Sequence, residues 1–170
     1  MILDNNLVFG TATALVSSTT SIASGVIDLT GGQTLGIGNA SAFGADMGVG
    51  PGQAAPQVRV IATTALTTTN SATLNIAFQG NAVASSAADA NWITYIETGA
   101  IAASALTVST TIARFDYPIR QVAAAMPRYV RLLYQFATGS FSTGSATAFL
   151  TLTGDDWEAR YYPSGFTVAA

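Results

Sequence analysis

The chain has 170 residues, of which 49% are hydrophobic and only 9% are charged, and its nine acidic residues and six arginines give a net charge of −3. An average globular protein has about 25% charged residues. This length suits one domain with a real hydrophobic core. The charge balance argues against a nucleic-acid partner, because neutralising phosphates normally needs a clustered Lys/Arg surface.

Three residue types that carry much of enzyme chemistry are missing: the sequence contains no histidine, no cysteine and no lysine. Histidine is the commonest general base and metal ligand, cysteine supplies thiol nucleophiles, and lysine is needed for P-loops and Schiff bases. We therefore expect a protein that is not an enzyme and needs no cofactor. A surface with so few ions is also easily buried against a partner, which favours a component of an assembly.

The N-terminus gives no sign of a targeting segment. Residues 1–6 lack a basic region and carry Asp4 where a signal peptide would be apolar. No stretch approaches the roughly 20 apolar residues of a membrane helix. We therefore expect a soluble intracellular product with no membrane partner.

Apolar residues alternate with polar ones along most of the chain, as in strands that bury one face. Residues 22–29 and 91–97 are short candidate strands. The clearer alternating runs are 58–62, 73–78, 106–112, 130–136 and 146–152. Only residues 10–18 and 119–126 could form short helices, and Pro127 would end the second.

Turn-forming residues separate these runs, and they predict hairpins over residues 57–79 and 128–153. Eight glycines between Gly31 and Gly52 predict a long ordered loop at about 31–56, because glycine weakens helices and strands. These glycines lack the strand and helix context of a dinucleotide-binding fingerprint. About seven short strands joined by turns predict an all-β fold, a single-domain β-sandwich or jelly roll over residues 1–170.

The acidic cluster of the sequence follows Gly154 and consists of Asp155, Asp156 and Glu158. Their carboxylates could bind a hard cation such as Ca²⁺, but the spacing matches no calcium-binding loop, so we favour a solvated turn. The spacing of the other acidic residues singles out no glycosidase pair. We therefore expect neither a metal site nor catalytic residues.

The C-terminal tail, residues 154–170, is rich in aromatic residues, and it contains Trp157, Arg160, Tyr161 and Tyr162. Aromatic residues and arginine are enriched at the energetic centres of protein interfaces. Two interpretations stay open: the tail anchors the protein to a partner, or it folds back as a last strand whose rings close the end of the sandwich. Aromatic rings also bind sugars, so a carbohydrate-binding module is a rival.

Arg131 alternates with Val130 and Leu132, so its side chain points to the opposite face of the predicted strand. An ordinary solvent-facing arginine is one interpretation. The other is that Arg131, with Arg128 and Tyr129 beside it, pairs with acidic residues of a neighbouring subunit, since the guanidinium fork suits a carboxylate.

Several blocks of the sequence resemble the Bordetella-phage-type capsid cement proteins, and they occur in the order found in that family. They are Met1-Ile2-Leu3-Asp4 with Phe9, Val26-Ile27-Asp28-Leu29, Asp46-Met47-Gly48-Val49-Gly50, Pro127-Arg128-Tyr129-Val130-Arg131-Leu132-Leu133-Tyr134, and Gly139 to Gly144. The set spans nearly the whole chain. The segment between Leu29 and Asp46 and the tail after Gly154 match the family pattern least.

This resemblance implies a jelly-roll-like fold and a structural role on the outer capsid surface of a virion, after synthesis in the host cytoplasm. The expected partner is the major capsid protein, with neighbouring capsomers bridged. We also expect a homo-oligomer, a dimer more than a trimer, because a clip needs two equivalent ends. The candidate contact residues, to subunit or capsid, are Leu3, Phe9, Trp157, Arg160, Tyr161 and Tyr162. The rival is a carbohydrate-binding or adhesion β-sandwich on a virion or cell surface.

Overall fold

The computed structural model describes residues 7–16, 20–28, 56–68, 70–81, 91–116 and 129–152, and these residues form strands and the connections between them. The elements are β1 (Val8–Ala14), β2 (Ser21–Ala23), β3 (Ile27–Asp28), β4 (Pro56–Thr67), β5 (Thr73–Asn81), β6 (Ile93–Glu97), β7 (Ile101–Ala102), the 3₁₀ helix η2 (Ala103–Ala105), β8 (Thr111–Asp116), β9 (Tyr129–Ala137) and β10 (Thr143–Leu152).

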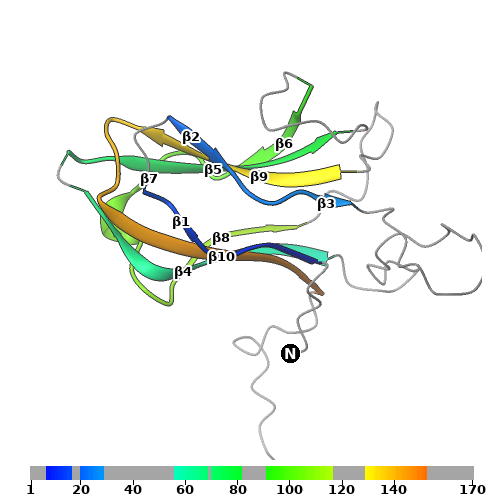
Figure 1. Ribbon diagram of the computed structural model, residues 1–170, viewed down its shortest axis with the longest axis horizontal. Coiled ribbons are helices and arrows are strands. Elements are labelled where there is room, and N and C mark those ends of the chain that lie inside the picture. The colour runs from blue at the N-terminus through cyan, green and yellow to red at the C-terminus, as the bar shows by residue number, and fades with distance from the viewer. Residues whose placement is uncertain are drawn as a thin grey trace, which may run out of the picture.

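The strands form two antiparallel sheets that lie one above the other as a sandwich (Figure 1). One sheet has the order β1-β10-β4-β8, and the other has the order β2-β9-β5-β6, with β3 also pairing with β9 and β7 with β5. Because β2 and β3 share one edge position and β6 and β7 share another, the sandwich has eight strand positions. Counted along the chain, the sheets run 1-8-3-6 and 2-7-4-5, which is a jelly roll. The predicted all-β, single-domain sandwich is confirmed.

The two predicted hairpins, over residues 57–79 and 128–153, are wrong. β4 pairs with β10 and β8, whereas β5 pairs with β9, β6 and β7, so the strands of the first predicted hairpin lie in different sheets. The same holds for β9 and β10. The alternating pattern shows which face of a strand is buried but not which strand lies beside it, and a short turn can also cross between layers.

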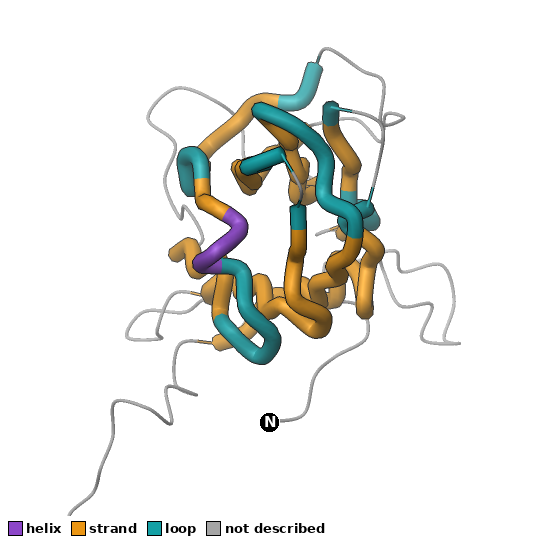
Figure 2. The backbone as a smooth tube through the Cα atoms, turned by 90° about the vertical axis from the view of Figure 1, so that its left-hand side faces the viewer, coloured by secondary structure: helices purple, strands orange, loops and turns teal. Residues whose placement is uncertain are grey.

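The two crossing connections lie side by side at one end of the sandwich, the end that faces the viewer in Figure 2. The Thr68 hydroxyl donates a hydrogen bond of 3.0 Å to the Ser140 carbonyl, and the Thr138 hydroxyl donates one of 2.8 Å to the Ser71 carbonyl. Ser71 and Thr138 both have positive φ, 54° and 60°. These hydrogen bonds join one corner to the other and help hold both in these left-handed conformations.

Gly144 is required where β10 begins. Its φ is 143°, and a Cβ atom there would lie 2.5 Å from the Leu66 Cγ atom and 3.0 Å from the Leu66 Cα atom. Any larger residue would be strained and would push against the backbone of β4. The glycine therefore lets β10 approach β4 closely enough to start their pairing.

Two further sequence predictions fail locally. Residues 10–14, predicted as part of a helix, belong to β1, while residues 119–126 lie outside the described part of the chain. In the run 106–112, the strand begins only at Thr111. Ser109 has a φ of 62°, so the chain turns before it enters β8, and alternation within a turn does not mark a strand.

The hydrophobic core lies between the sheets and is made of the residues that alternate in β4, β5, β9 and β10, as the pattern predicts. Its members include Val58, Val60, Leu74, Ile76, Phe78, Val130, Leu132, Tyr134, Ala146, Ala148 and Leu150. β1 contributes Phe9, whose ring meets that of Phe78 edge-on at 6.3 Å between centroids. Burial raises the pKa of the Tyr134 hydroxyl above its ordinary value, because an ionised phenolate would lack solvation there.

The glycine-rich segment, about 31–56, lies outside the described residues apart from Pro56, with which β4 begins. The tail, residues 154–170, lies outside them as well. Among the residues that the structure describes, no helix has the length and apolar character to cross a membrane.

Candidate interaction surface

The predicted contact residues are not brought together within the described structure. Phe9 is 2% exposed and lies in the core, so its ring supports the sandwich from within and is not presented to a second chain. This placement corrects the expectation of an intermolecular contact there, because alternation along β1 turns Phe9 inward. The other candidates lie outside the described residues, and they are Leu3, Trp157, Arg160, Tyr161 and Tyr162.

The described residues hold no group of three or more metal-ligating side chains. The acidic cluster Asp155, Asp156 and Glu158 falls outside them. The sandwich has two outer faces, one on each sheet, and the register of the strands gives the residues of each.

The outer face of the sheet β2-β9-β5-β6 carries a network of side-chain amides. The Asn75 Nδ2 atom donates hydrogen bonds to Glu97 Oε2 at 3.0 Å and to Gln135 Oε1 at 2.9 Å. The Thr98 hydroxyl donates to Asn75 Oδ1 at 3.2 Å. These bonds link three neighbouring strands, so the polar groups of this face mainly satisfy one another.

Arg131 lies on the same outer face, yet it is 4% exposed, so the solvent-facing interpretation is wrong. Its Nε atom donates a hydrogen bond of 3.0 Å to Gln79 Oε1, and its guanidinium carbon lies 4.1 Å from the centroid of the Trp92 ring. A buried arginine needs such partners to offset its desolvation. Sequence reasoning missed this role because the cover comes from Trp92, on the segment leading into β6.

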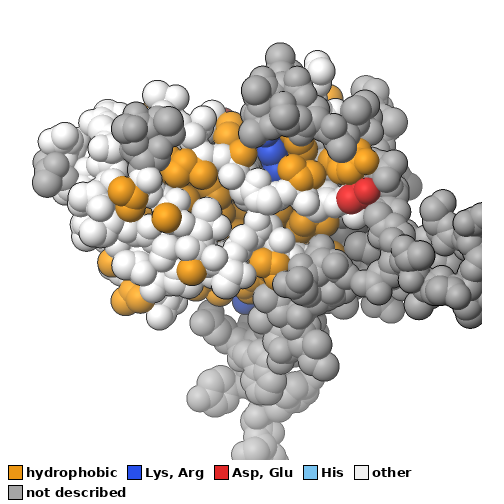
Figure 3. All heavy atoms as spheres, in the orientation of Figure 1, with side chains coloured by type: hydrophobic (Ala, Val, Ile, Leu, Met, Phe, Trp, Pro, Cys, Tyr) orange, Lys and Arg blue, Asp and Glu red, His pale blue; other side chains and the backbone are white. Residues whose placement is uncertain are grey.

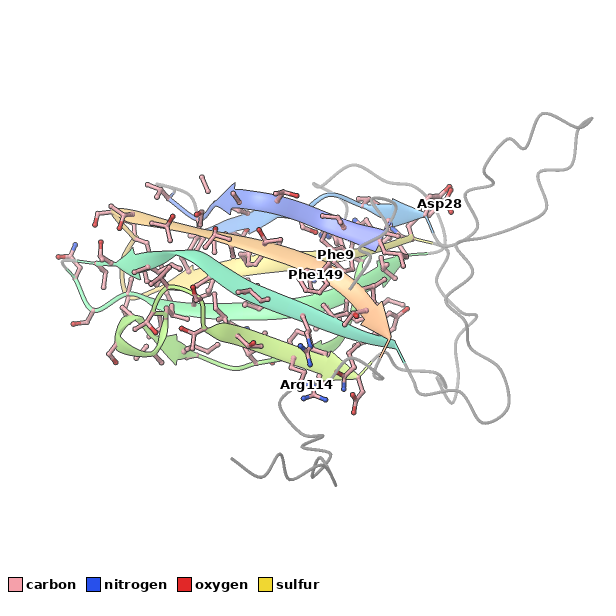
Figure 4. The ribbon with its side chains drawn as sticks, turned by 90° about the horizontal axis from the view of Figure 1, so that it is seen from below. Phe9, Asp28, Arg114 and Phe149 are labelled. Carbon is pink, nitrogen blue, oxygen red and sulfur yellow. The ribbon has the colours of Figure 1, made fainter. Side chains whose placement is uncertain are left out.

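The outer face of the other sheet carries a row of four side chains that crosses all four strands. Val8 on β1 pairs with Phe149 on β10, which pairs with Arg59 on β4, which in turn pairs with Arg114 on β8. Phe149 is buried, Val8 and Arg59 are half-buried, and Arg114 is exposed. Figure 4 looks onto this face and labels Phe149 and Arg114. We call these four residues the arginine row.

The arginine row is apolar at one end and cationic at the other. Arg59 and Arg114 lie directly opposite each other, so two cationic side chains adjoin on neighbouring strands. One row along, the Gln57 Nε2 atom donates a hydrogen bond of 2.7 Å to Asp116 Oδ1. Gln57 is 4% exposed, and its Oε1 atom is buried with no hydrogen-bond partner among the described residues.

The row was not foreseen from the sequence, although each arginine sits between two buried residues of an alternating strand. Val58 and Val60 flank Arg59, and Ala113 and Phe115 flank Arg114. This signal shows that both arginines point outward. Their juxtaposition depends on the pairing of β4 with β8, strands that are far apart in the sequence.

The described surface in the view of Figure 3 shows few charged side chains, and most of its atoms are backbone atoms or belong to side chains that are neither hydrophobic nor charged. The exposed large hydrophobic residues among those described are Val16, Val26, Ile93, Ile96 and Val108. Every described aromatic side chain is buried or half-buried. A sugar-binding platform of exposed rings is therefore missing from the described part of the chain.

A family model described as Bbp16 matches residues 9–150 of the chain. The match covers β1 to β10 except for the first residue of β1 and the last two of β10. A search of curated proteins finds no match.

Proposed function

This chain belongs to the Bbp16 family, a family of Bordetella phage proteins, and we propose that it is a capsid cement protein. In this role it binds the outer surface of the major capsid protein and stabilises the phage head by bridging neighbouring capsomers. The observation that carries the proposal is the family match over nearly the whole sandwich. The carbohydrate-binding alternative is less well supported, since the described residues include no exposed aromatic ring.

The sandwich has the properties that a bridging element needs. A clip must transmit force without opening, and the two sheets enclose a continuous core whose crossing connections are hydrogen-bonded to each other. Only 9% of the residues of the chain are charged, so few ions are desolvated when its surface is covered. The proposed bridging role requires that the protein binds the capsid and keeps its fold under load. It requires no catalytic step and no cofactor.

Bridging two capsomers requires two contact surfaces, and a symmetric homo-oligomer supplies two copies of one surface. We therefore propose that the protein acts as a homo-oligomer, a dimer in preference to a trimer. The contacts to subunit or capsid would come from Leu3 near the N-terminus and from Trp157, Arg160, Tyr161 and Tyr162 in the tail. Phe9 is left out of this set because it lies in the core.

Deletion of residues 155–170 tests whether the tail attaches the protein to the capsid. We expect the truncated sandwich to fold but to bind shells at least tenfold more weakly, because aromatic contact residues at interfaces contribute roughly 2 kcal/mol or more each. The measurement is occupancy on purified shells that lack the protein, by co-sedimentation, together with the melting temperature of the decorated shells. Val108→Ser, which removes an exposed apolar side chain of the sandwich itself, is the matched control.

Equal occupancy and equal shell melting for full-length and truncated protein would show that the tail is a structural plug and that attachment lies elsewhere. If the full-length protein bound no shells but bound glycans, the proposed function itself would be wrong.

A further inference from the structure

We propose that the edge strand β6 is the subunit interface of a symmetric dimer, in which β6 of one copy pairs antiparallel with β6 of a second copy. The inference builds on the homo-oligomer of the proposed function and names the surface through which two copies meet. It rests on the outer edge of β6, on the exposed side chains of Ile93 and Ile96, and on the register that brings these isoleucines together.

The strand β6 ends the sheet β2-β9-β5-β6 and pairs with β5 on one side. None of the described residues forms a strand on its other side. Such an edge presents backbone N–H and C=O groups to which a further strand can bond, and natural sheets commonly protect it with lysine, proline or other charged residues. β6 contains no proline, the chain contains no lysine, and Glu97, the last residue of β6, is the only charged residue of the strand. The edge is therefore open to another strand.

Ile93 and Ile96 lie on the core-facing side of β6, yet both are partly exposed. Ile96 pairs with Phe78, which is a core residue. Ile93 pairs with Gly80, two residues further along β5. Tyr95 is an extra residue in this pairing, so isoleucines three positions apart reach the same face. Ile93 is 53% exposed and Ile96 is 40% exposed. The two side chains thus form an apolar strip at the margin of the sandwich, which one more strand would cover.

One antiparallel register of two copies matches this strip to itself. When the two-fold axis passes between Thr94 and Tyr95, Ile93 of one copy lies opposite the partner's Ile96, and the symmetry repeats the pair. Opposed side chains on neighbouring antiparallel strands have Cβ atoms about 4.5–5.5 Å apart. Each isoleucine therefore gains an apolar neighbour, and the self-match favours a second copy over an unrelated strand.

Charge favours the same register. The Glu97 carboxylate accepts a hydrogen bond from Asn75 within its own chain. In the proposed register the two Glu97 residues of the dimer are five positions apart, which is about 17 Å along the strands. A register centred on Glu97 would place two carboxylates opposite each other, and like charges in that position are destabilising.

Pairing of this kind would join the sheets β2-β9-β5-β6 of two copies into one continuous sheet. A two-fold contact uses both β6 edges, so assembly through this edge stops at two copies. The two sandwiches would lie side by side, as an element that bridges two capsomers requires. The contacts proposed above for Leu3 and the tail would then be contacts with the capsid.

Analytical ultracentrifugation of the full-length protein tests the interface. We expect the wild type to form dimers in the micromolar range. Ile93→Thr and Ile96→Thr each keep a β-branched side chain but remove apolar surface, and each change acts twice in a symmetric dimer. Either variant should raise the dissociation constant roughly tenfold or more. Val108→Thr is the matched control, because Val108 is 57% exposed and lies outside β6. Circular dichroism checks that every variant keeps its fold.

Disulfide cross-linking tests the register, and the chain suits it because it contains no cysteine. Ile93→Cys and Ile96→Cys are prepared as separate proteins, mixed, and then oxidised. The mixture should give a covalent dimer, since these two positions face each other. Either variant alone should give roughly tenfold less, because equivalent residues are three positions apart, about 10 Å along the strands, and Cα atoms more than about 7 Å apart cannot be bridged.

A monomeric wild type, or equal association for the wild type and both threonine variants, would overturn the proposal. Cross-linking of Ile93→Cys alone at the rate of the mixture would also overturn it. These measurements need no capsid, so they are separate from the test of the cement role. A protein that dimerises through β6 but leaves shells bare would contradict the cement role alone, whereas monomers that decorate shells would contradict the dimer alone.

Discussion

Replacing Phe9 by alanine is expected to lower the free energy of unfolding by about 3–5 kcal/mol, which is the usual cost of removing a fully buried phenylalanine ring. The ring is 2% exposed and packs edge-on against Phe78, a residue that is completely buried on the opposite sheet. Its removal would leave a cavity between the layers that rigid strands cannot close. The measurement is equilibrium unfolding by urea, followed by circular dichroism.

Phe149→Ala is the matched control, since Phe149 is 4% exposed but lies outside the core cluster, on the outer face of its sheet. Figure 4 labels both phenylalanines. We expect this change to cost less, about 1.5–3 kcal/mol, because only the transfer free energy of one buried ring is lost and no cavity opens between the layers. If the two variants were equally stable, Phe9 would not be the core residue that the structure indicates.

Replacing Arg131 by alanine is expected to cost about 2–4 kcal/mol. The change removes a buried hydrogen bond between a charged group and Gln79, worth roughly 1.5–3 kcal/mol, and a stacking contact with Trp92 of about 1–2 kcal/mol. It also leaves the Gln79 acceptor without its partner. Urea unfolding again measures the effect.

The Arg131→Lys variant tests whether stability depends on the planar shape of the guanidinium group or only on its positive charge. Lysine keeps the positive charge but has no planar fork to stack on the Trp92 ring while bonding to Gln79. We expect it to recover less than half of the lost stability. Full recovery by lysine, or a cost below about 0.5 kcal/mol for the alanine variant, would mean that Arg131 behaves as an ordinary surface arginine.

The sequence predicts which residues of a strand are buried better than it predicts which strands pair with one another. Alternation identified Val58, Val60, Leu132 and Leu150 as core residues, because a half-buried strand needs an apolar residue at every second position. It could not show that β4 and β5 lie in different sheets, because short turns serve both hairpins and crossings between layers. The jelly-roll topology depends on the pairing of strands that are far apart in the sequence. No short stretch of the sequence indicates which strands pair.

The candidate surface could be predicted only in part, for the same reason. That Arg59 and Arg114 point outward follows from their flanking residues, but their meeting depends on the pairing of β4 and β8. The surroundings of Arg131 include Trp92, which is distant in sequence and whose ring lies against the guanidinium group. Phe9 was misjudged because an aromatic residue near a terminus has the same composition signal whether it plugs the core or binds a partner.

The central claim, that this Bbp16-family protein cements a capsid, is tested most directly by electron cryomicroscopy of purified virions that contain it. The cement role predicts density for the two-layered sandwich on the outer surface of the shell, in contact with at least two capsid subunits around each copy. Shells that lack the protein should show no such density and should break at a lower temperature. Virions that carry the protein on tail fibres, or not at all, with a bare shell of unchanged stability, would contradict the claim.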